Sequence, residues 1–96
     1  IRYRDLDVDT DKCLVLLNGE EVHLTSTEYK LLCYLIENKG RIVTKAMLLE
    51  QLWDIDGNFV DENTVRVNIK RLRQKLNDDK QEYIVTVFGM GYTFGE

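Results

Sequence analysis

Residues 60–76 read VDENTVRVNIKRLRQKL, a stretch with the apolar periodicity of an amphipathic helix. Four apolar residues, spaced by four, three and four positions, line one narrow face of it. These are Val65, Ile69, Leu72 and Leu76. Asp61, the second residue of this stretch, is in the position of an N-cap. The sequence therefore predicts a helix over about 61–77 whose apolar stripe packs against a core.

The opposite face of the predicted helix carries positive charge, amides and one valine. Its centre consists of Asn63, Val67, Lys70 and Gln74 with Arg71 beside them, and its edges of Arg66, Asn68, Arg73 and Lys75. Arginine pairs with guanine, asparagine and glutamine pair with adenine, and an aliphatic group contacts the thymine methyl. Since a protein that binds only phosphates needs only the charges, this mixture favours a face that reads the bases of double-stranded DNA.

The charge of the chain is unevenly distributed. The net charge is −4, yet residues 63–77 carry +5 with no acidic side chain, against −6 over residues 1–62 and −3 over residues 78–96. A solvated helix face usually mixes signs, because Glu–Lys pairs four residues apart stabilise a helix. The charge run alone leaves a solvated face and a nucleic-acid interface equally open, and the base-reading residue types favour the interface.

Two further helices precede this one. Thr25, with Glu28 three residues later, forms a capping box for a helix that we expect to end at Gly40. Thr44 caps a second helix. The connection over residues 54–60 is longer than the short turn of a simple helix-turn-helix, so it has room to serve another partner.

Strands are predicted at both ends of the chain. Residues 1–25 read as short antiparallel strands with Asn18-Gly19 as a hairpin turn. Residues 84–94 read as two strands around a glycine-bearing turn. Because strands and helices are segregated, the sequence predicts an α+β fold, a helix-turn-helix that carries a hairpin wing.

Length and composition bound the class of protein. The chain has 96 residues, 44% of them hydrophobic, which suits one domain with a single core. No apolar run approaches the roughly 18 residues of a membrane span, so we expect no membrane partner. Because the chain begins at Ile1 rather than Met, we expect it to be a segment of a longer protein.

No residue pattern indicates catalysis. Cys13 and Cys33 are interpreted as small buried thiols, and His23 as a structural residue of a strand. The aspartates from Asp7 onward lack the glycine and glutamate of a calcium loop. The two glycines at 89–91 lack the strand-to-helix context of a dinucleotide site. We expect no enzyme activity, no metal and no cofactor.

Four stretches together carry a family resemblance. They are LTSTEYKLLCYLIENKG, IVTKAMLLEQLW, VDENTVRVNIKRLRQKL and IVTVFGMGYTF. In order and spacing they resemble the C-terminal effector domain of OmpR/PhoB-type response regulators, and the resemblance covers the chain from about residue 5 onward. It implies a single winged helix-turn-helix domain with an N-terminal four-stranded antiparallel sheet, three helices and a C-terminal β-hairpin wing, in a cytoplasmic bacterial two-component system.

The same resemblance implies the DNA-binding residues. Positions in or beside the major groove are Asn63, Thr64, Arg66, Val67, Asn68, Lys70, Arg71 and Gln74. Among these we expect Arg71 on a base edge, and Lys70 with Arg73 on phosphates. Lys45 and Trp53 match positions that contact the DNA backbone, although Trp53 fits a core aromatic equally well.

The wing departs from the family pattern at one position. Thr86, Gly89 and Tyr92 match positions that touch phosphate or the minor groove. Members often carry arginine before the wing glycine, whereas this chain has Phe88. An uncharged side chain cannot use the negative potential of a narrow minor groove. Phe88 therefore either packs on sugar edges or folds back onto the domain.

The resemblance also implies partners. The residues that match an RNA polymerase contact are Asp54, Ile55, Asp56, Gly57, Asn58 and Phe59. It further implies a preceding receiver domain, a sensor kinase acting through that receiver, and a homodimer on direct repeats of DNA. The rival interpretation is a winged helix that contacts another protein through its acidic sheet. A steep fall of affinity for duplex DNA with rising salt would distinguish DNA binding from this alternative.

Overall fold

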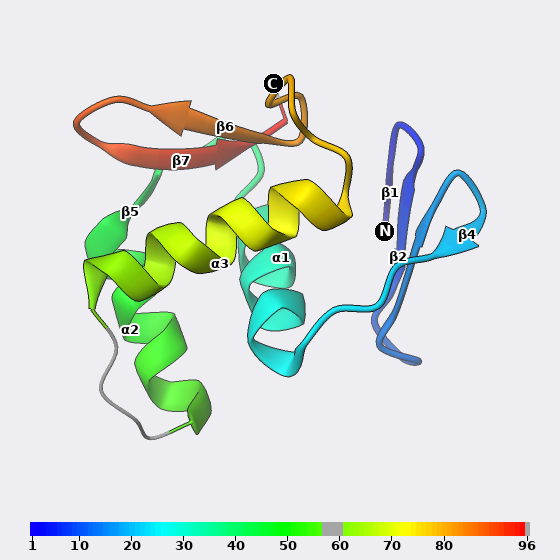
Figure 1. Cartoon of the computed structure of the whole chain (residues 1–96), viewed down its shortest axis with the longest axis horizontal. Coiled ribbons are helices and arrows are strands. Elements are labelled where there is room, and N and C mark those ends of the chain that lie inside the picture. The colour runs from blue at the N-terminus through cyan, green and yellow to red at the C-terminus, as the bar shows by residue number, and fades with distance from the viewer. Residues whose placement is uncertain (57–60, 96) are drawn as a thin grey trace.

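The computed structural model describes residues 1–56 and 61–95, and side chains throughout those ranges except at 53–56. Ten elements follow one another along the chain (Figure 1). They are β1 (Arg2–Tyr3), β2 (Leu6–Asp9), β3 (Leu14–Leu17), β4 (Glu20–Glu21), α1 (Ser26–Glu37), β5 (Val43–Thr44), α2 (Lys45–Asp56), α3 (Glu62–Lys75), β6 (Ile84–Val87) and β7 (Gly91–Phe94). Apart from the two-residue β5 between α1 and α2, the described strands and helices occupy separate parts of the chain, which confirms the predicted α+β fold.

The N-terminal sheet has the order β1-β2-β3-β4, with every neighbouring pair antiparallel. Its β3–β4 turn is the predicted hairpin, in which Asn18 and Gly19 both take positive φ, at 53° and 80°. Figure 1 shows this sheet at one end of the molecule, beside the C-terminal end of α3. The sheet thus lies away from the N-terminal half of α3.

The start of α1 has the predicted capping box. The Glu28 N–H donates to Thr25 Oγ1 at 3.2 Å, and the Thr25 N–H donates to Glu28 Oε1 at 2.9 Å. The end of α1 was expected at Gly40, but the helix ends at Glu37 with Asn38 as its cap. Gly40 instead lies in the turn that follows the helix, where its φ is 83°. The turn therefore requires the glycine, and the end of the helix does not.

A second sheet, with the order β5-β7-β6, includes a strand that the sequence did not predict. β5 is only two residues long, and its Thr44 pairs with Gly91 of β7 while its Oγ1 accepts the N–H of Met47 at 3.1 Å. Thr44 is therefore both a strand residue and the predicted cap of α2. Gly91 is required here because a Cβ on it would lie 2.1 Å from the carbonyl oxygen of Val43.

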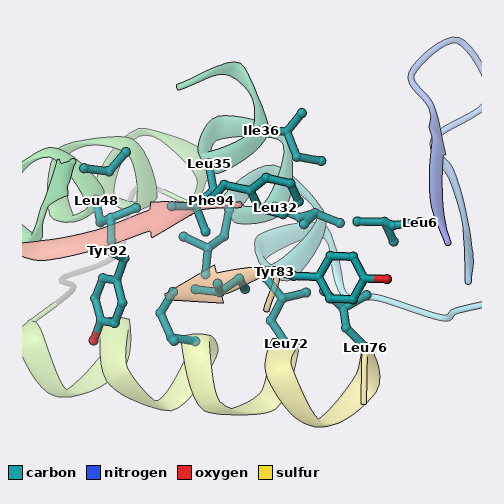
Figure 2. Packing of buried hydrophobic residues seen from close by; sticks show 14 of the residues in the cluster. Leu6, Leu32, Leu35, Ile36, Leu48, Leu72, Leu76, Tyr83, Tyr92 and Phe94 are labelled. Carbon is teal, nitrogen blue, oxygen red and sulfur yellow. The ribbon is translucent and has the colours of Figure 1, made fainter. Parts of the chain in front are cut away.

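The hydrophobic core draws on both sheets and all three helices. Its fully buried members include Leu6 of the N-terminal sheet, Leu32 of α1, Leu48 of α2, Leu72 of α3 and Phe94 of β7. Figure 2 shows these side chains converging between α3 and the other helices, with the strands of the second sheet among them. The hairpin is therefore packed into the same core as α3.

Three local expectations were wrong. Cys13, expected to be buried in a strand, is exposed in the β2–β3 turn with φ 52°, because β2 ends at Asp9 and the turn extends to residue 13. His23, expected in a strand, follows the end of β4 and is 87% exposed, where its Nδ1 lies 3.1 Å from Glu21 Oε2. The connection predicted over 54–60 starts later, because the backbone of α2 stays helical to Asp56.

Candidate nucleic-acid interface

The predicted cap and apolar stripe orient α3. Asp61 Oδ1 accepts the N–H of Thr64 at 2.9 Å and its hydroxyl at 3.0 Å. These bonds lower the pKa of the Asp61 carboxyl. The four stripe residues, predicted from their spacing, are each at most 2% exposed. Cap and stripe together fix which residues of α3 face away from the domain.

The opposite face of α3 holds the predicted base-reading set. Its exposed members are Asn63, Arg66, Lys70, Arg71 and Gln74. Three more, which are half-buried, are Thr64, Val67 and Asn68. We call these eight residues the outer face of α3. Val67 was expected to be exposed at the centre of this face, but it is half-buried.

Two polar contacts already order the outer face. The Arg66 guanidinium donates to Asn63 Oδ1 at 3.2 Å, and the Asn68 amide donates to the Thr64 carbonyl at 2.9 Å. The bond to Thr64 uses one of the two N–H donors of the Asn68 amide and leaves its oxygen as an acceptor. Arg71, Lys70 and Gln74 stand along the same exposed surface, so cationic and amide groups are presented together.

Two of the five cations of α3 point elsewhere. The Arg73 guanidinium donates to the Ile84 carbonyl at 3.0 and 2.8 Å and to Thr86 Oγ1 at 2.8 Å. Lys75 Nζ donates to Glu28 Oε1 at 2.5 Å. Although residues 63–77 contain no acidic side chain, Lys75 thus has an acidic partner in Glu28, 47 residues earlier in the chain. Arg66, Lys70 and Arg71 are the cations of α3 that remain on its outer face.

Glu28 and Asp78 are buried, and the sequence did not predict the burial of either residue. Glu28 is 1% exposed; burial raises its pKa, but the bonds from Lys75 and from the Thr25 N–H outweigh burial and leave the pKa below its usual value. Asp78 is 2% exposed and accepts the N–H groups of Glu82, Tyr83 and Ile84 at 2.7 to 2.9 Å. Glu28 had a signal as the N3 residue of the capping box, whereas nothing local marks Asp78.

Arg73 and Asp78 connect α3 to the wing. Asp78 binds the backbone at the start of β6, and Arg73 binds the first and third residues of that strand. Burial lowers the pKa of Arg73, and the nearby negative charge of Asp78 opposes that effect. The Arg73 guanidinium also lies 5.8 Å from the ring centroid of Tyr92. Helix and hairpin are thus held in a fixed relation by polar contacts as well as by the core.

The predicted wing residues have different surroundings. Thr86 is half-buried against Arg73, Tyr92 is 6% exposed, and Gly89 takes φ 77° in the exposed turn. Phe88 is 92% exposed, so of the two alternatives left open by the sequence, folding back onto the domain does not occur. No charged side chain occurs between residues 83 and 95. The wing therefore presents an uncharged, apolar tip.

Lys45 follows directly after the β5 residue that pairs with the wing. It is exposed at the start of α2, one residue after Thr44, whose partner across the sheet is Gly91 of the wing. The side chain of Trp53 and those of Asp54, Ile55 and Asp56 lie outside the described residues, as do Gly57, Asn58 and Phe59 entirely. The predictions of a backbone contact at Trp53 and of a polymerase contact at 54–59 stay predictions.

Other chemistry has little support in the described parts of the chain. Among residues 1–56 and 61–95, no group of three or more His, Cys, Asp or Glu side chains is arranged to hold a metal ion. Burial raises the pKa of the Cys33 thiol, which opposes formation of a reactive thiolate. Within the same residues, no helix has the length and apolar character needed to cross a membrane.

The fold and its exposed outer face define a winged helix-turn-helix domain. The family model described as "Transcriptional regulatory protein, C terminal" matches residues 19–94. The chain belongs to this family, the DNA-binding domains of OmpR/PhoB-type response regulators, whose members regulate transcription. This confirms the resemblance given by the four sequence stretches.

Individual relatives agree with this assignment. The uncharacterized transcriptional regulatory protein YcbL of Bacillus subtilis is 41% identical over all of this chain and 43% of its own length. The response regulator DrrB of Thermotoga maritima, an OmpR/PhoB homolog, superimposes with a TM-score of 0.89 at 36% identity, over 100% of this chain and 44% of DrrB. The chain thus spans about two fifths of the length of these relatives.

One similar structure includes nucleic acid. The DNA-binding domain of RstA from Klebsiella pneumoniae was solved in complex with the RstA box. It superimposes with a TM-score of 0.85 at 35% identity, covering 99% of this chain and 95% of that domain. A domain of this size and fold therefore exists as a separate DNA-binding unit in a similar protein.

Proposed function

We propose that the chain binds double-stranded DNA sequence-specifically and controls transcription, with α3 in the major groove. The observation that carries the proposal is the outer face of α3, where exposed cations stand among amides on a helix fixed by its buried stripe. A major groove about 12 Å wide admits such a helix, and arginine and amide side chains match the edges of guanine and adenine. The RstA complex supports the same class of ligand.

Individual roles follow from exposure and donor geometry. Arg71 is exposed near the middle of α3 and can donate two parallel hydrogen bonds to guanine. Lys70 and Lys45, both exposed, offer compact charges suited to phosphates. Arg73 was expected on a phosphate, but its three hydrogen bonds to β6 support a positioning role instead. The residues proposed to lie in or beside the major groove are Asn63, Thr64, Arg66, Val67, Asn68, Lys70, Arg71 and Gln74.

The redistribution of charge changes the expected electrostatics. With Arg73 and Lys75 engaged inside the fold, the exposed cations near the DNA are Arg66, Lys70, Arg71 and Lys45. Lys45 and Lys70, the two proposed phosphate contacts, contribute about −1.8 to the log–log slope of affinity against salt, at about −0.9 per contact. The acidic remainder of the chain repels DNA elsewhere and so favours approach by this surface.

The domain also fits a larger regulatory protein. We propose that a receiver domain precedes it, that a sensor kinase acts through that receiver in the cytoplasm, and that two copies bind direct repeats as a homodimer. Specific sites generally need an interface of about 1,000–2,500 Å², which one small module does not easily supply. The proposed RNA polymerase contact is the segment 54–59, which begins within the last turn of α2.

Binding to duplex sequences selected from a random pool tests the proposal. The chain should enrich a motif and lose affinity steeply as salt rises. A matched control is the triple variant Arg66→Ala, Lys70→Ala and Arg71→Ala, in which the core stripe, the Lys75–Glu28 ion pair and the hydrogen bonds of Arg73 are untouched. If the chain binds no duplex, or its affinity does not depend on salt, the domain serves protein contact and the proposal is wrong.

A further inference from the structure

Among the described residues, β6 is an edge strand, because the second sheet has the order β5-β7-β6 and β6 pairs with β7 on one side. Figure 1 shows it as the upper border of the hairpin. The outer side of an edge strand carries N–H and C=O groups without a strand partner, and these groups can template the addition of another strand. The four residues of β6 are all β-branched and uncharged, which favours such pairing.

The other edge strands of the described residues are protected by their length or their charge. β1, β4 and β5 have two residues each, and β4 consists of Glu20 and Glu21. Short strands and charged side chains are common means by which proteins keep an edge from pairing with another chain. β6 has neither of these features, so its outer side depends on another form of protection.

The backbone groups of Ile84 and Thr86 point away from β7. The Val87 carbonyl closes the hairpin turn by accepting the Met90 N–H at 3.0 Å, so Val87 faces β7. In an antiparallel pair, the backbone groups of successive residues alternate between the partner strand and the outer side. Val85 therefore faces β7 as well, and the N–H and C=O groups of Ile84 and Thr86 form the outer side of β6.

Side chains from outside the sheet occupy this outer side. Asp78 Oδ2 accepts the Ile84 N–H at 2.8 Å, and the Arg73 guanidinium donates to the Ile84 carbonyl at 3.0 and 2.8 Å. Gln81 Oε1 accepts the Thr86 N–H at 3.3 Å. Arg73 belongs to α3, whereas Asp78 and Gln81 belong to the segment between α3 and β6. These three side chains therefore bind backbone groups with which a further strand would otherwise pair.

We infer that Arg73, Asp78 and Gln81 close the edge of β6 and thereby prevent two copies of the chain from pairing hairpin to hairpin. A second copy is the partner that the uncovered edge fits, because two identical edges can pair about a twofold axis. No charged side chain occurs between residues 83 and 95, so the net charge of −4 brings no like-charge repulsion to the line where the edges would meet.

This symmetric pair differs from the two copies proposed on direct repeats of DNA, which follow one another in the same direction. Pairing through β6 joins the same surface of both copies, whereas a direct repeat joins different surfaces. The closed edge therefore keeps the free domain monomeric without opposing the arrangement proposed on DNA.

Analytical ultracentrifugation over a wide range of concentration tests the inference on the double variant Arg73→Ala and Gln81→Ala. This variant uncovers the Ile84 carbonyl and the Thr86 N–H and should sediment as a dimer at high concentration, whereas the unmodified chain should remain a monomer. Glu28→Ala is the matched control, since it removes the contacts of Glu28 with Thr25 and Lys75 and leaves the edge of β6 covered. The control should remain a monomer.

A proline in β6 shows whether the association uses the edge of the strand. Proline lacks an N–H and is tolerated on an edge strand where that N–H points away from the sheet. Thr86→Pro, added to the double variant, removes an outward donor and should return the protein to a monomer.

Amide hydrogen exchange provides a second measurement on a variant that keeps Arg73 and Asp78. Gln81 is exposed, so Gln81→Ala should fold as the unmodified chain does. In this variant the Thr86 N–H should exchange about two- to tenfold faster, the range that corresponds to the loss of one hydrogen bond. The Ile84 N–H, which is still bonded to Asp78, should exchange as slowly as before.

Four results would overturn the inference. The double variant could fold and stay monomeric at every concentration, or Glu28→Ala could associate to the same extent, which would attribute the association to lost stability. The proline variant could remain a dimer, or the Thr86 amide could exchange at the same rate with and without the Gln81 side chain. The exchange rate of Thr86 decides the outcome if the double variant does not fold.

Discussion

Lys75 Nζ lies 2.5 Å from Oε1 of Glu28, so the last turn of α3 is joined to the first turn of α1 by a charged hydrogen bond. The same carboxylate oxygen accepts the Thr25 N–H of the capping box. Glu28 is buried whereas 37% of the Lys75 side chain is exposed. One acidic residue therefore caps α1 and removes one of the five positive charges from the DNA-binding surface.

Removal of this carboxylate should destabilise the domain. We expect Glu28→Ala to lower the free energy of unfolding by about 2 kcal/mol, because it leaves the Thr25 N–H and a partly screened ammonium without their acceptor. Urea denaturation measures the change. Lys70→Ala serves as the control, since it removes an exposed lysine of the same helix and should alter stability by less than about 0.5 kcal/mol. Equal stability of Glu28→Ala and the unmodified chain would contradict the assigned role.

Stability should also depend on pH through Glu28. Its pKa is lowered in the folded domain from an ordinary value of 4.5, so the unfolded chain binds more protons as the pH falls. This contribution is fully present above pH 4.5 and is lost as the pH decreases through the folded pKa. Glu28→Gln should therefore show a flatter decline of unfolding free energy with acid than the unmodified chain. Parallel pH profiles would refute the linkage.

Replacement of Arg73 separates a positioning role from a phosphate contact. Because its guanidinium makes three hydrogen bonds to β6, Arg73→Ala should lower the free energy of unfolding by about 2 kcal/mol. Its salt slope for DNA binding should stay unchanged, since no phosphate contact is lost. A variant of undiminished stability whose salt slope falls by about one unit would instead place Arg73 on a phosphate.

The two wing glycines should differ in their tolerance of alanine. A Cβ at Gly91 would lie 2.1 Å from the Val43 carbonyl oxygen, so Gly91→Ala forces β5 and β7 apart. We expect a loss above about 2 kcal/mol there. A Cβ at Gly89 meets nothing within 4 Å, so Gly89→Ala carries only the strain of its positive φ, about 1 kcal/mol. Thermal unfolding of both variants would show the order, and equal losses would contradict it.

The sequence predicted features that depend on neighbouring residues. The caps Thr25, Thr44 and Asp61, the Asn18-Gly19 turn and the apolar stripe of α3 are all set by spacings of a few positions. These local signals sufficed to place the helices and the outer face of α3.

Features that depend on distant residues could not be predicted in this way. The acceptors of Arg73 lie 11 and 13 positions away and that of Lys75 lies 47 away, so no helical wheel reveals them. β5 is two residues long and exists only because β7 provides its partner. The exposed position of Cys13 likewise depends on where the β2–β3 turn begins.

The most direct test of α3 as the base-reading helix is sequence selection from a random duplex pool with the unmodified chain, Arg71→Ala and Lys45→Ala. We expect Arg71→Ala to lose preference at one base pair, a cost of about 1–3 kcal/mol at that position. Lys45→Ala should weaken binding to all sequences alike and lower the salt slope by about one unit. An Arg71→Ala chain that selects the same motif with undiminished preference would contradict the assignment of α3 to the bases.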